Sequence, residues 1–327
     1  MGLGLTALDQ KKLLKSPLKE GIRKEGTQPD FVEASSLEPP TGYVGNERFS
    51  MKKSRTIARI VKGTPAVDGA GVKLTRVLGG NTIEDFDPFL MLDSFDSTNP
   101  PDYLRGFPTH PHRGIETITY LVEGTLAHQD SLGNKGLITP GACQWMTAGR
   151  GILHQEMPLE AERFLGLQLW LNLPAAKKMT EPKYFDIQPE DVGVAHDSCA
   201  TVRVISGSYE GVEGVKPHHI QATLLDVSLK EGQSIEIPVK EEETVFIFTL
   251  LGDVMVEGEI FNQKTALLMK DGDQVEVSAL PGQTARFILA SAPALHEPVA
   301  WGGPIVMNTR EELQQAFSEL RAGTFIN

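Results

Sequence analysis

The sequence predicts an all-β protein made of two tandem β-barrels followed by a C-terminal helix. From residue 56 onward, short segments rich in β-branched and apolar residues alternate with turns that contain glycine or proline; examples are Thr56–Val61, Val72–Leu78, Phe89–Asp93 and Thr117–Val122. Short strands at this spacing, with turn signals between them, are typical of β-sandwiches and β-barrels. The 40% hydrophobic content is enough for a packed core.

An internal repeat predicts that the barrel occurs twice. Glu116–Gly124 resembles Glu243–Gly252, and Leu137–Gly141 resembles Leu268–Gly272. Both matches have nearly the same offset, about 130 residues. Two weak matches at one offset carry more weight than either alone, although β-rich sequences also resemble one another by composition.

The repeat sets the expected domain organisation. A first domain is expected over 51–180 and a second over 181–327, linked near Pro174–Pro189. Residues 1–50 mix Lys, Glu, Pro and Gly without a sustained apolar period, and they lack the apolar core of a signal peptide. They are expected to be an N-terminal extension that is poorly ordered or appended.

One helix is expected at the C-terminal end. Thr309 and Glu312 have the spacing of a capping box, and Leu313, Phe317 and Leu320 follow at helical spacing. This helix is expected to pack back across a barrel in a structural role.

Composition narrows the classes of protein that are possible. Acidic residues number 43 and basic residues 31, a formal charge of −12, which argues against direct nucleic-acid binding because that needs a basic surface. The only cysteines, Cys143 and Cys199, do not form a secreted disulfide framework and favour the cytoplasm, with the nucleus open for a eukaryotic source. No apolar run reaches the roughly 18 residues of a transmembrane helix, so no membrane association is expected.

Two short motifs carry the chemistry. His110 and His112 are separated by one residue, as are His154 and Glu156. Alternate residues of a strand point to the same face, so two such pairs on adjacent strands would present four ligands inside a barrel. Three imidazoles and one carboxylate suit Fe(II), Mn(II), Ni(II) or Zn(II). One His-x-His pair by itself is most often a pair of solvated histidines, but a second pair behind a glycine-rich turn favours a metal site.

The residues around these motifs resemble the pirin family. The resemblance extends from about residue 55 to 325 and is most specific in three segments: Gly106–Thr117, Gln144–Pro158 and Gly302–Thr309. It implies a bicupin, meaning two tandem double-stranded β-helix (jelly-roll) barrels. It also implies one divalent metal, Fe(II) foremost with Mn, Ni and Zn as alternatives, held in the first barrel only by His110, His112, His154 and Glu156.

An alternative ligand is Glu116. Many cupins place a glutamate four or five positions after a His-x-His pair, and Glu116 lies four residues after His112, on the same face by parity. In that arrangement Glu116 would be the ligand and Glu156 would not. The pirin resemblance favours Glu156.

The remaining histidines are not expected to bind the metal. His128 is expected at an exposed edge, with a place behind the ligands as the alternative. His218 and His219 are adjacent and would face opposite sides of a strand. His196 and His296 are expected on the surface. The second barrel has no His-x-His pair and is expected to bind no metal.

The resemblance implies two kinds of role. One is a quercetin 2,3-dioxygenase-like oxidoreductase that opens a flavonol ring with O₂, with Glu156 as the general base and a small aromatic substrate. Phe107, Trp145 and Met146 would then be candidates for the apolar wall, with ordinary barrel core as the alternative. The other role is an iron-dependent regulator that binds protein partners such as transcription factors. A metal-free structural bicupin is a third possibility.

Overall fold

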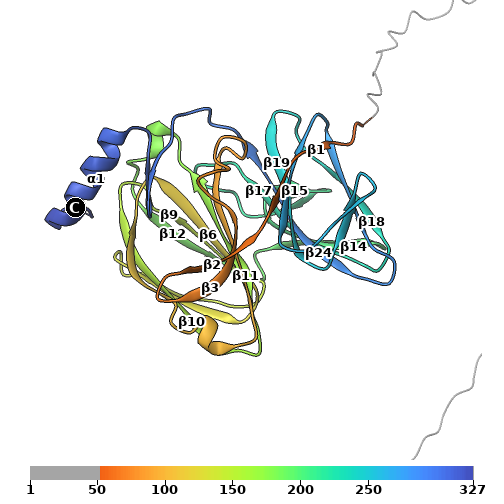
Figure 1. Ribbon diagram of the computed structural model, residues 1–327, viewed down its shortest axis with the longest axis horizontal. Coiled ribbons are helices and arrows are strands. Elements are labelled where there is room, and N and C mark those ends of the chain that lie inside the picture. Colours follow the sequence, from red (N-terminus) through yellow and green to blue (C-terminus); the bar gives the residue numbers. More distant parts are fainter. Residues whose placement is uncertain (1–51, 327) are drawn as a thin grey trace, which may run out of the picture. The chain divides into compact units, whose positions relative to one another are not determined.

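The computed structural model describes residues 52–326 (Figure 1). The expected extension over 1–50 lies outside the described residues. The described residues belong to one compact unit. Among them, no helix is long and apolar enough to cross a membrane.

The first barrel consists of a seven-stranded sheet, in the order β12-β9-β6-β11-β4-β3-β2, and a four-stranded sheet, in the order β5-β10-β7-β8. All the pairings are antiparallel. The strands are β2 (Thr64–Asp68), β3 (Val72–Leu78), β4 (Phe89–Ser97), β5 (Phe107–His112), β6 (Ile115–Glu123), β7 (Thr125–Asp130), β8 (Lys135–Ile138), β9 (Cys143–Thr147), β10 (Ile152–Leu159), β11 (Phe164–Asn172) and β12 (Lys183–Ile187).

The second barrel repeats this plan. Its seven-stranded sheet has the order β1-β22-β19-β24-β17-β14-β13, and its four-stranded sheet has the order β18-β23-β20-β21. The strands are β1 (Thr56–Lys62), β13 (Gly193–His196), β14 (Ala200–Ser206), β17 (Thr223–Leu229), β18 (Ser234–Pro238), β19 (Glu243–Leu251), β20 (Val254–Val256), β21 (Glu259–Phe261), β22 (Thr265–Lys270), β23 (Gln274–Ala279) and β24 (Ala285–Pro293), with a small hairpin of β15 (Ser208–Tyr209) and β16 (Val212–Glu213). The predicted all-β architecture of two jelly-roll barrels is confirmed.

In each seven-stranded sheet, one edge strand comes from a part of the sequence that lies outside the rest of that barrel. Strand β1, near the N-terminal end of the described chain, pairs with β22 of the second barrel. Strand β12 follows the expected boundary at residue 180 but pairs with β9 of the first barrel. The two strands occupy the same edge position in the two sheets. The barrels are therefore joined by exchanged strands as well as by a linker.

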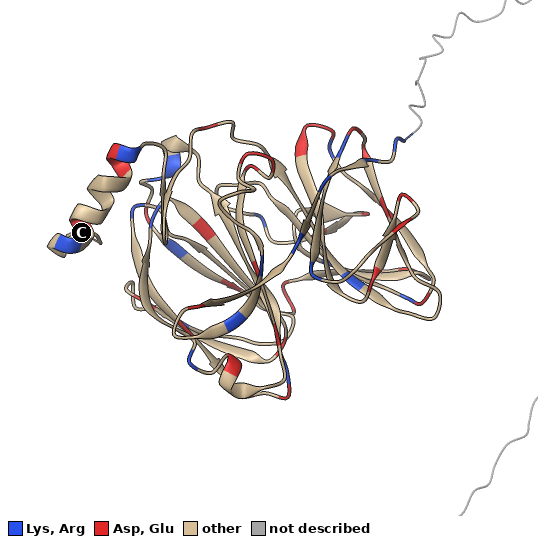
Figure 2. Ribbon diagram, in the orientation of Figure 1, with Lys and Arg blue, Asp and Glu red and all other residues tan. Residues whose placement is uncertain are grey.

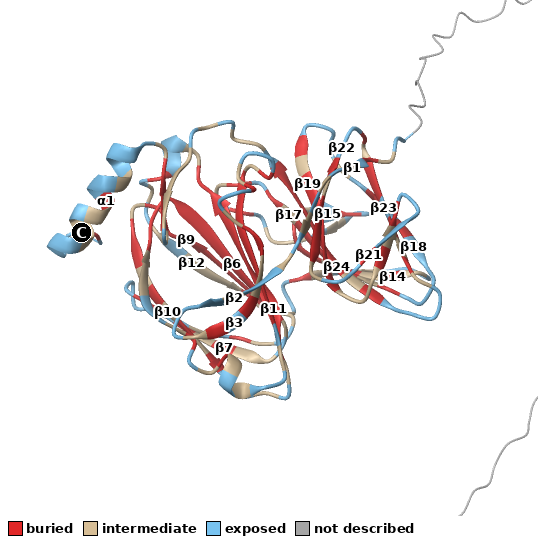
Figure 3. Ribbon diagram, viewed as in Figure 1, coloured by how far each residue is buried: buried red, intermediate tan, exposed pale blue. Residues whose placement is uncertain are grey.

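The two seven-stranded sheets share a hydrophobic core. Ile118 and Tyr120 of β6 belong to the same buried cluster as Phe246 and Phe248 of β19. Phe89 packs edge-to-face on Phe246, with ring centroids 4.9 Å apart. Burial of one such side chain stabilises the fold by about 1.5–3 kcal/mol. Figure 3 shows this buried interior along the strands, and Figure 2 shows charged residues mostly in loops, at strand ends and on the helix.

The C-terminal segment returns to the first barrel through β25 (Ala300–Gly302), β26 (Ile305–Met307) and α1 (Arg310–Ala322). The predicted capping box of Thr309 and Glu312 is present. Arg113 forms an ion pair with Glu319 of α1 at 2.6 Å. Gly114 has a φ of 78°, and a Cβ there would lie 1.9 Å from the carbonyl oxygen of Val306. Only glycine fits this position, which lies two residues after His112.

Candidate metal centre

Three histidines meet inside the first barrel because β5 and β10 are antiparallel neighbours. His110 lies opposite His154 in the register of these strands, and His112 lies opposite Ile152. Nε2 of His110 is 3.0 Å from Nε2 of His112 and 2.9 Å from Nε2 of His154. His112 and His154 are each 1% exposed, and His110 is partly buried. The strand periodicity thus brings both histidine motifs to one point.

The hydrogen bonds of two of these rings leave their Nε2 lone pairs directed at the cluster. Nδ1 of His110 lies 2.9 Å from the carbonyl oxygen of Pro108, and Nδ1 of His112 lies 3.1 Å from that of Pro304. A carbonyl oxygen only accepts, so each Nδ1 carries the ring proton and donates it. Burial, with a smaller contribution from charge on His110, lowers the pKa of His112 to about 3, so this ring is neutral at pH 7.

The two lone pairs of His110 and His112 that converge in this way fit a bound cation. Two nitrogens that coordinate one metal at right angles, each at about 2.1 Å, lie about 3 Å apart. The separations within the cluster match this value. Burial, together with charge on its histidine neighbours, also lowers the pKa of His154 well below its usual range. The residues present therefore fit a divalent transition metal.

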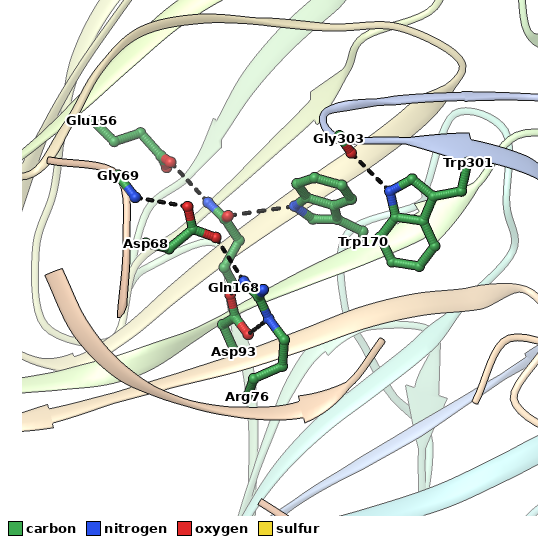
Figure 4. Close-up of polar contacts among 9 residues, drawn as sticks. All are labelled: Asp68, Gly69, Arg76, Asp93, Glu156, Gln168, Trp170, Trp301 and Gly303. Carbon is green, nitrogen blue, oxygen red and sulfur yellow. Dashed lines mark hydrogen bonds and ion pairs between the residues drawn. The ribbon is translucent and has the colours of Figure 1, made fainter. Parts of the chain in front are cut away.

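Glu156 lies beside this cluster, held by two hydrogen bonds. Its Oε1 accepts from the Thr119 hydroxyl at 2.8 Å, and its Oε2 accepts from Nε2 of Gln168 at 2.7 Å. Oε1 of Gln168 in turn accepts from Nε1 of Trp170 at 3.4 Å (Figure 4). The carboxylate is therefore oriented from both sides. One oxygen of Glu156 and one ring nitrogen each of His128 and His154 lie within 4.8 Å of one another. Ring nitrogens of His110, His112 and His154 form a separate group of this kind.

Glu116 is directed away from the histidines and does not group with them as a potential ligand, which favours Glu156. Its neighbours at alternate positions of β6, Ile118 and Tyr120, belong to the core between the two sheets. Oε1 of Glu116 accepts from the Thr147 hydroxyl at 2.7 Å. Burial raises the pKa of Glu116 to about 7. The parity argument from His112 fails because the left-handed Gly114 interrupts the strand between β5 and β6.

His128 lies in the interior, so the expectation of an exposed edge was wrong. The residue is 3% exposed, and its ring stacks on Tyr184 with centroids 4.7 Å apart. It faces inward together with Leu126 and Asp130, the alternate positions of β7. The alternation of side chains along β7 could therefore have indicated that His128 faces the interior. The exposed positions of His196 and His296 agree with the expectation for those residues, whereas His218 and His219 lie in a bend and not on a strand.

A row of polar side chains distinguishes the first barrel from the second. It crosses neighbouring positions of β6, β11, β4 and β3 and consists of Thr119, Gln168, Asp93 and Arg76. The second sheet has the same strand order, and its corresponding row consists of Ile247, Leu289, Leu225 and Val204, all buried. The first barrel therefore carries polar side chains where the second has an aliphatic core at the matching positions.

A pocket of about 510 Å³ opens onto the histidine cluster. His110 and His112 line it, together with an apolar wall made by Met91, Phe107, Trp170 and Trp301. Of the three wall residues expected from the sequence, only Phe107 is in this lining. Trp145 and Met146 are fully buried in two hydrophobic clusters, so the alternative of ordinary core holds for them. Trp301 comes from the returning C-terminal segment and is fixed by a 2.7 Å hydrogen bond from its Nε1 to the Gly303 carbonyl.

A charged cluster forms another part of the pocket lining (Figure 4). Nε and Nη2 of Arg76 donate to the two carboxylate oxygens of Asp93 at 2.9 and 2.7 Å, and Nη2 also donates to Asp68 at 2.7 Å. Burial raises the pKa of Asp93 although Arg76 acts in the opposite direction. Among the described residues, Nη1 of Arg76 has no hydrogen-bond partner, so it can donate to a ligand.

Two jelly-roll barrels in one chain, the first with a buried histidine cluster and a pocket, define a bicupin. Models of the pirin family match residues 71–171 (Pirin) and 224–326 (Pirin C-terminal cupin domain). The chain belongs to the pirin family. It is 44% identical to a pirin-like protein of Caulobacter vibrioides over 83% of this chain and 99% of the relative.

Other relatives agree with this assignment. Human pirin is 39% identical over 83% of this chain and 94% of the relative. The crystal structure of a quercetin 2,3-dioxygenase from Acinetobacter baumannii superposes with a TM-score of 0.76 at 30% identity, covering 84% of this chain and all of that one.

Proposed function

We propose that this protein is a metal-dependent dioxygenase that opens a flat, hydroxylated aromatic ring of the flavonol type with O₂. In this proposal His110, His112, His154 and Glu156 hold the metal. The observation that carries it is that two of the converging histidines, His110 and His112, line a pocket with aromatic walls. The similarity to a structure named as a quercetin 2,3-dioxygenase supports the same substrate class.

Iron is the proposed metal because the pirin resemblance implies it, and the donor set is compatible with it. Imidazole and carboxylate ligands suit Fe(II), and Mn, Ni and Zn bind the same donors. The metal, when bound, would supply Lewis acidity toward the substrate oxygen and a position for O₂. Lone pairs that already face one another need no rearrangement of the rings to receive the ion.

Glu156 is the proposed general base. Its carboxylate lies next to the histidine cluster, and a flavonol hydroxyl must lose its proton before ring opening. The hydroxyl of Thr119 and the amide of Gln168 each donate to one oxygen of Glu156, which fixes where the proton is received. Gln168 also lines the pocket, so the orienting group lies within reach of the substrate.

The pocket offers both the surface and the polar groups that a hydroxylated aromatic needs. Phe107, Trp170 and Trp301 supply flat apolar walls for a planar ring. Arg76 and Asp68 supply a donor and an acceptor for hydroxyl groups away from the metal. With Asp93 the cluster has two acids and one base, which disfavours an anionic substrate such as an aromatic carboxylate.

The direct test is oxygen uptake with iron-loaded protein and quercetin, together with detection of released carbon monoxide. We expect uptake and carbon monoxide in a one-to-one ratio, abolished in His112→Ala. The control His196→Ala removes an exposed histidine of the second barrel and should retain full uptake. Iron-loaded protein that consumes no O₂ with any flavonol of a panel would overturn the proposal and favour the regulatory role implied by the resemblance.

A further inference from the structure

We propose that His128, His154 and Glu156 form a second position for a divalent transition metal, behind the three-histidine cluster. The two positions share His154 and Glu156, so a single ion occupies one or the other. This inference concerns metal binding alone and does not rest on the dioxygenase activity.

The three side chains are placed together by the pairing of β7 with β10. His128 lies opposite Glu156 in the register of these strands, two positions from His154. One potential ligand atom from each lies within 4.8 Å of the others, and all three residues are buried. Two imidazoles and one carboxylate are the donor set of many non-haem Fe(II) sites, and they also suit Co(II), Ni(II) and Zn(II).

The His128 ring stacks on Tyr184, but no hydrogen bond accounts for the burial of its two nitrogens. Neither Nδ1 nor Nε2 has a hydrogen-bond partner, although the side chain is fully enclosed. A buried polar atom left without a partner costs about 1–3 kcal/mol, and native structures rarely keep two on one ring. Asp130 Oδ2 lies 3.7 Å from Nε2, too far for a hydrogen bond but close enough to favour a proton on that nitrogen. Nδ1 is then the nitrogen free to bind a cation.

His154 has an unused nitrogen as well. Its Nε2 lies 2.9 Å from Nε2 of His110 in the first cluster, whereas its buried Nδ1 has no partner. The rings of His128 and His154 lie side by side, with centroids 5.2 Å apart. The unpartnered nitrogens of two adjacent rings therefore supply donors that the first position leaves unused, and Glu156 is common to both positions.

The two positions differ in their access to the pocket. His110 and His112 line it, and none of the three residues of the inner position does. An ion at the inner position is consequently shielded from a pocket ligand.

The test removes the outer position and asks whether binding survives. Co(II) is the probe, and its binding is measured by equilibrium dialysis and by its visible absorption. We expect His110→Ala/His112→Ala to bind Co(II) in dialysis more weakly than the wild type and with a changed spectrum, so that this variant still loses its metal during purification. Adding His128→Phe, which keeps an aromatic ring against Tyr184, should weaken that binding more than about 10-fold.

Three further variants complete the design. His128→Phe alone should leave one equivalent bound at the outer position, and adding His196→Ala to the double variant should change nothing. His128→Gln is a second substitution at the same position, in case His128→Phe does not fold. Circular dichroism checks the fold of each variant. A folded double variant that binds no Co(II), or binds it equally with and without His128, would overturn the inference. Oxygen uptake by the wild type is a separate readout, so failure of the second position is distinguishable from failure of the proposed activity.

Discussion

Gln168 donates a hydrogen bond from Nε2 to Oε2 of Glu156 at 2.7 Å, and both side chains are buried inside the first barrel. This contact links the pocket lining to the carboxylate beside the histidine cluster, because Gln168 belongs to both. Loss of a buried neighbour that orients a metal ligand typically lowers metal affinity or activity by about 10–100-fold.

Gln168→Met should therefore impair the site without removing a proposed ligand. We expect metal affinity or oxygen uptake to fall by about 10–100-fold. The free energy of unfolding should fall by about 1–3 kcal/mol, because Glu156 Oε2 and Trp170 Nε1 lose their partner. Metal titration and chemical denaturation measure the two effects. Gln221→Met, a substitution outside this pocket, is the control, and equal losses in both variants would argue against an orienting role.

The two candidate glutamates give opposite expectations. Glu156→Gln should weaken metal retention by at least about 10-fold, whereas Glu116→Gln should retain the metal, because Glu116 faces the core between the sheets. The measurement is metal content after dialysis against a weak chelator. Retention by Glu156→Gln and loss by Glu116→Gln would reverse the proposed ligand assignment.

Glu116 should also make stability depend on pH. Burial raises its pKa to about 7 in the folded protein from 4.5. The folded state thus binds more protons than the unfolded state between these values, and the contribution is fully present below pH 4.5 and lost as pH rises through about 7.

We expect the melting temperature of the wild type to fall relative to that of Glu116→Gln between pH 5 and pH 8. The corresponding free energy is a few kcal/mol at most. Melting curves of both proteins at several pH values measure it. Parallel curves would show that Glu116 keeps an ordinary pKa in the fold.

Arg76→Met tests the polar part of the pocket. The substitution removes the free Nη1 donor and leaves Asp93 and Asp68 without their cation, so quercetin affinity should fall by about 10-fold. Quenching of tryptophan fluorescence reports binding, because Trp170 and Trp301 line the same pocket. Arg59→Met is matched to it, since Arg59 pairs with Asp85 outside this lining. Unchanged affinity in Arg76→Met would place the substrate elsewhere.

The sequence predicted the parts of the site that depend on local periodicity. The alternation of strand side chains was enough to pair His110 with His112 and His154 with Glu156, and the structure brings the three histidines together. Glu116 was kept as an alternative because parity was counted across Gly114, whose positive φ breaks the strand. A local backbone feature changed the face on which a side chain lies.

Other parts of the site depend on long-range packing that a single sequence does not reveal. Trp301 and Pro304 reach the pocket from about 190 residues beyond His112. Trp145 was expected in the apolar wall of the substrate pocket because it lies near the second motif. It belongs instead to the core shared by the two sheets. Alternation along β7 places His128 on one face with Leu126 and Asp130, whereas the strands that cover this face are not evident from the sequence.

The central claim is that two side-chain pairs on β5 and β10 bind one transition metal in the first barrel. Elemental analysis of protein purified without added metal tests it most directly, with wild type, His112→Ala and His196→Ala compared. We predict about one equivalent of metal in the wild type and in His196→Ala, with most of it lost in His112→Ala. A wild type without metal, or a His112→Ala variant that retains it in full, would contradict the claim.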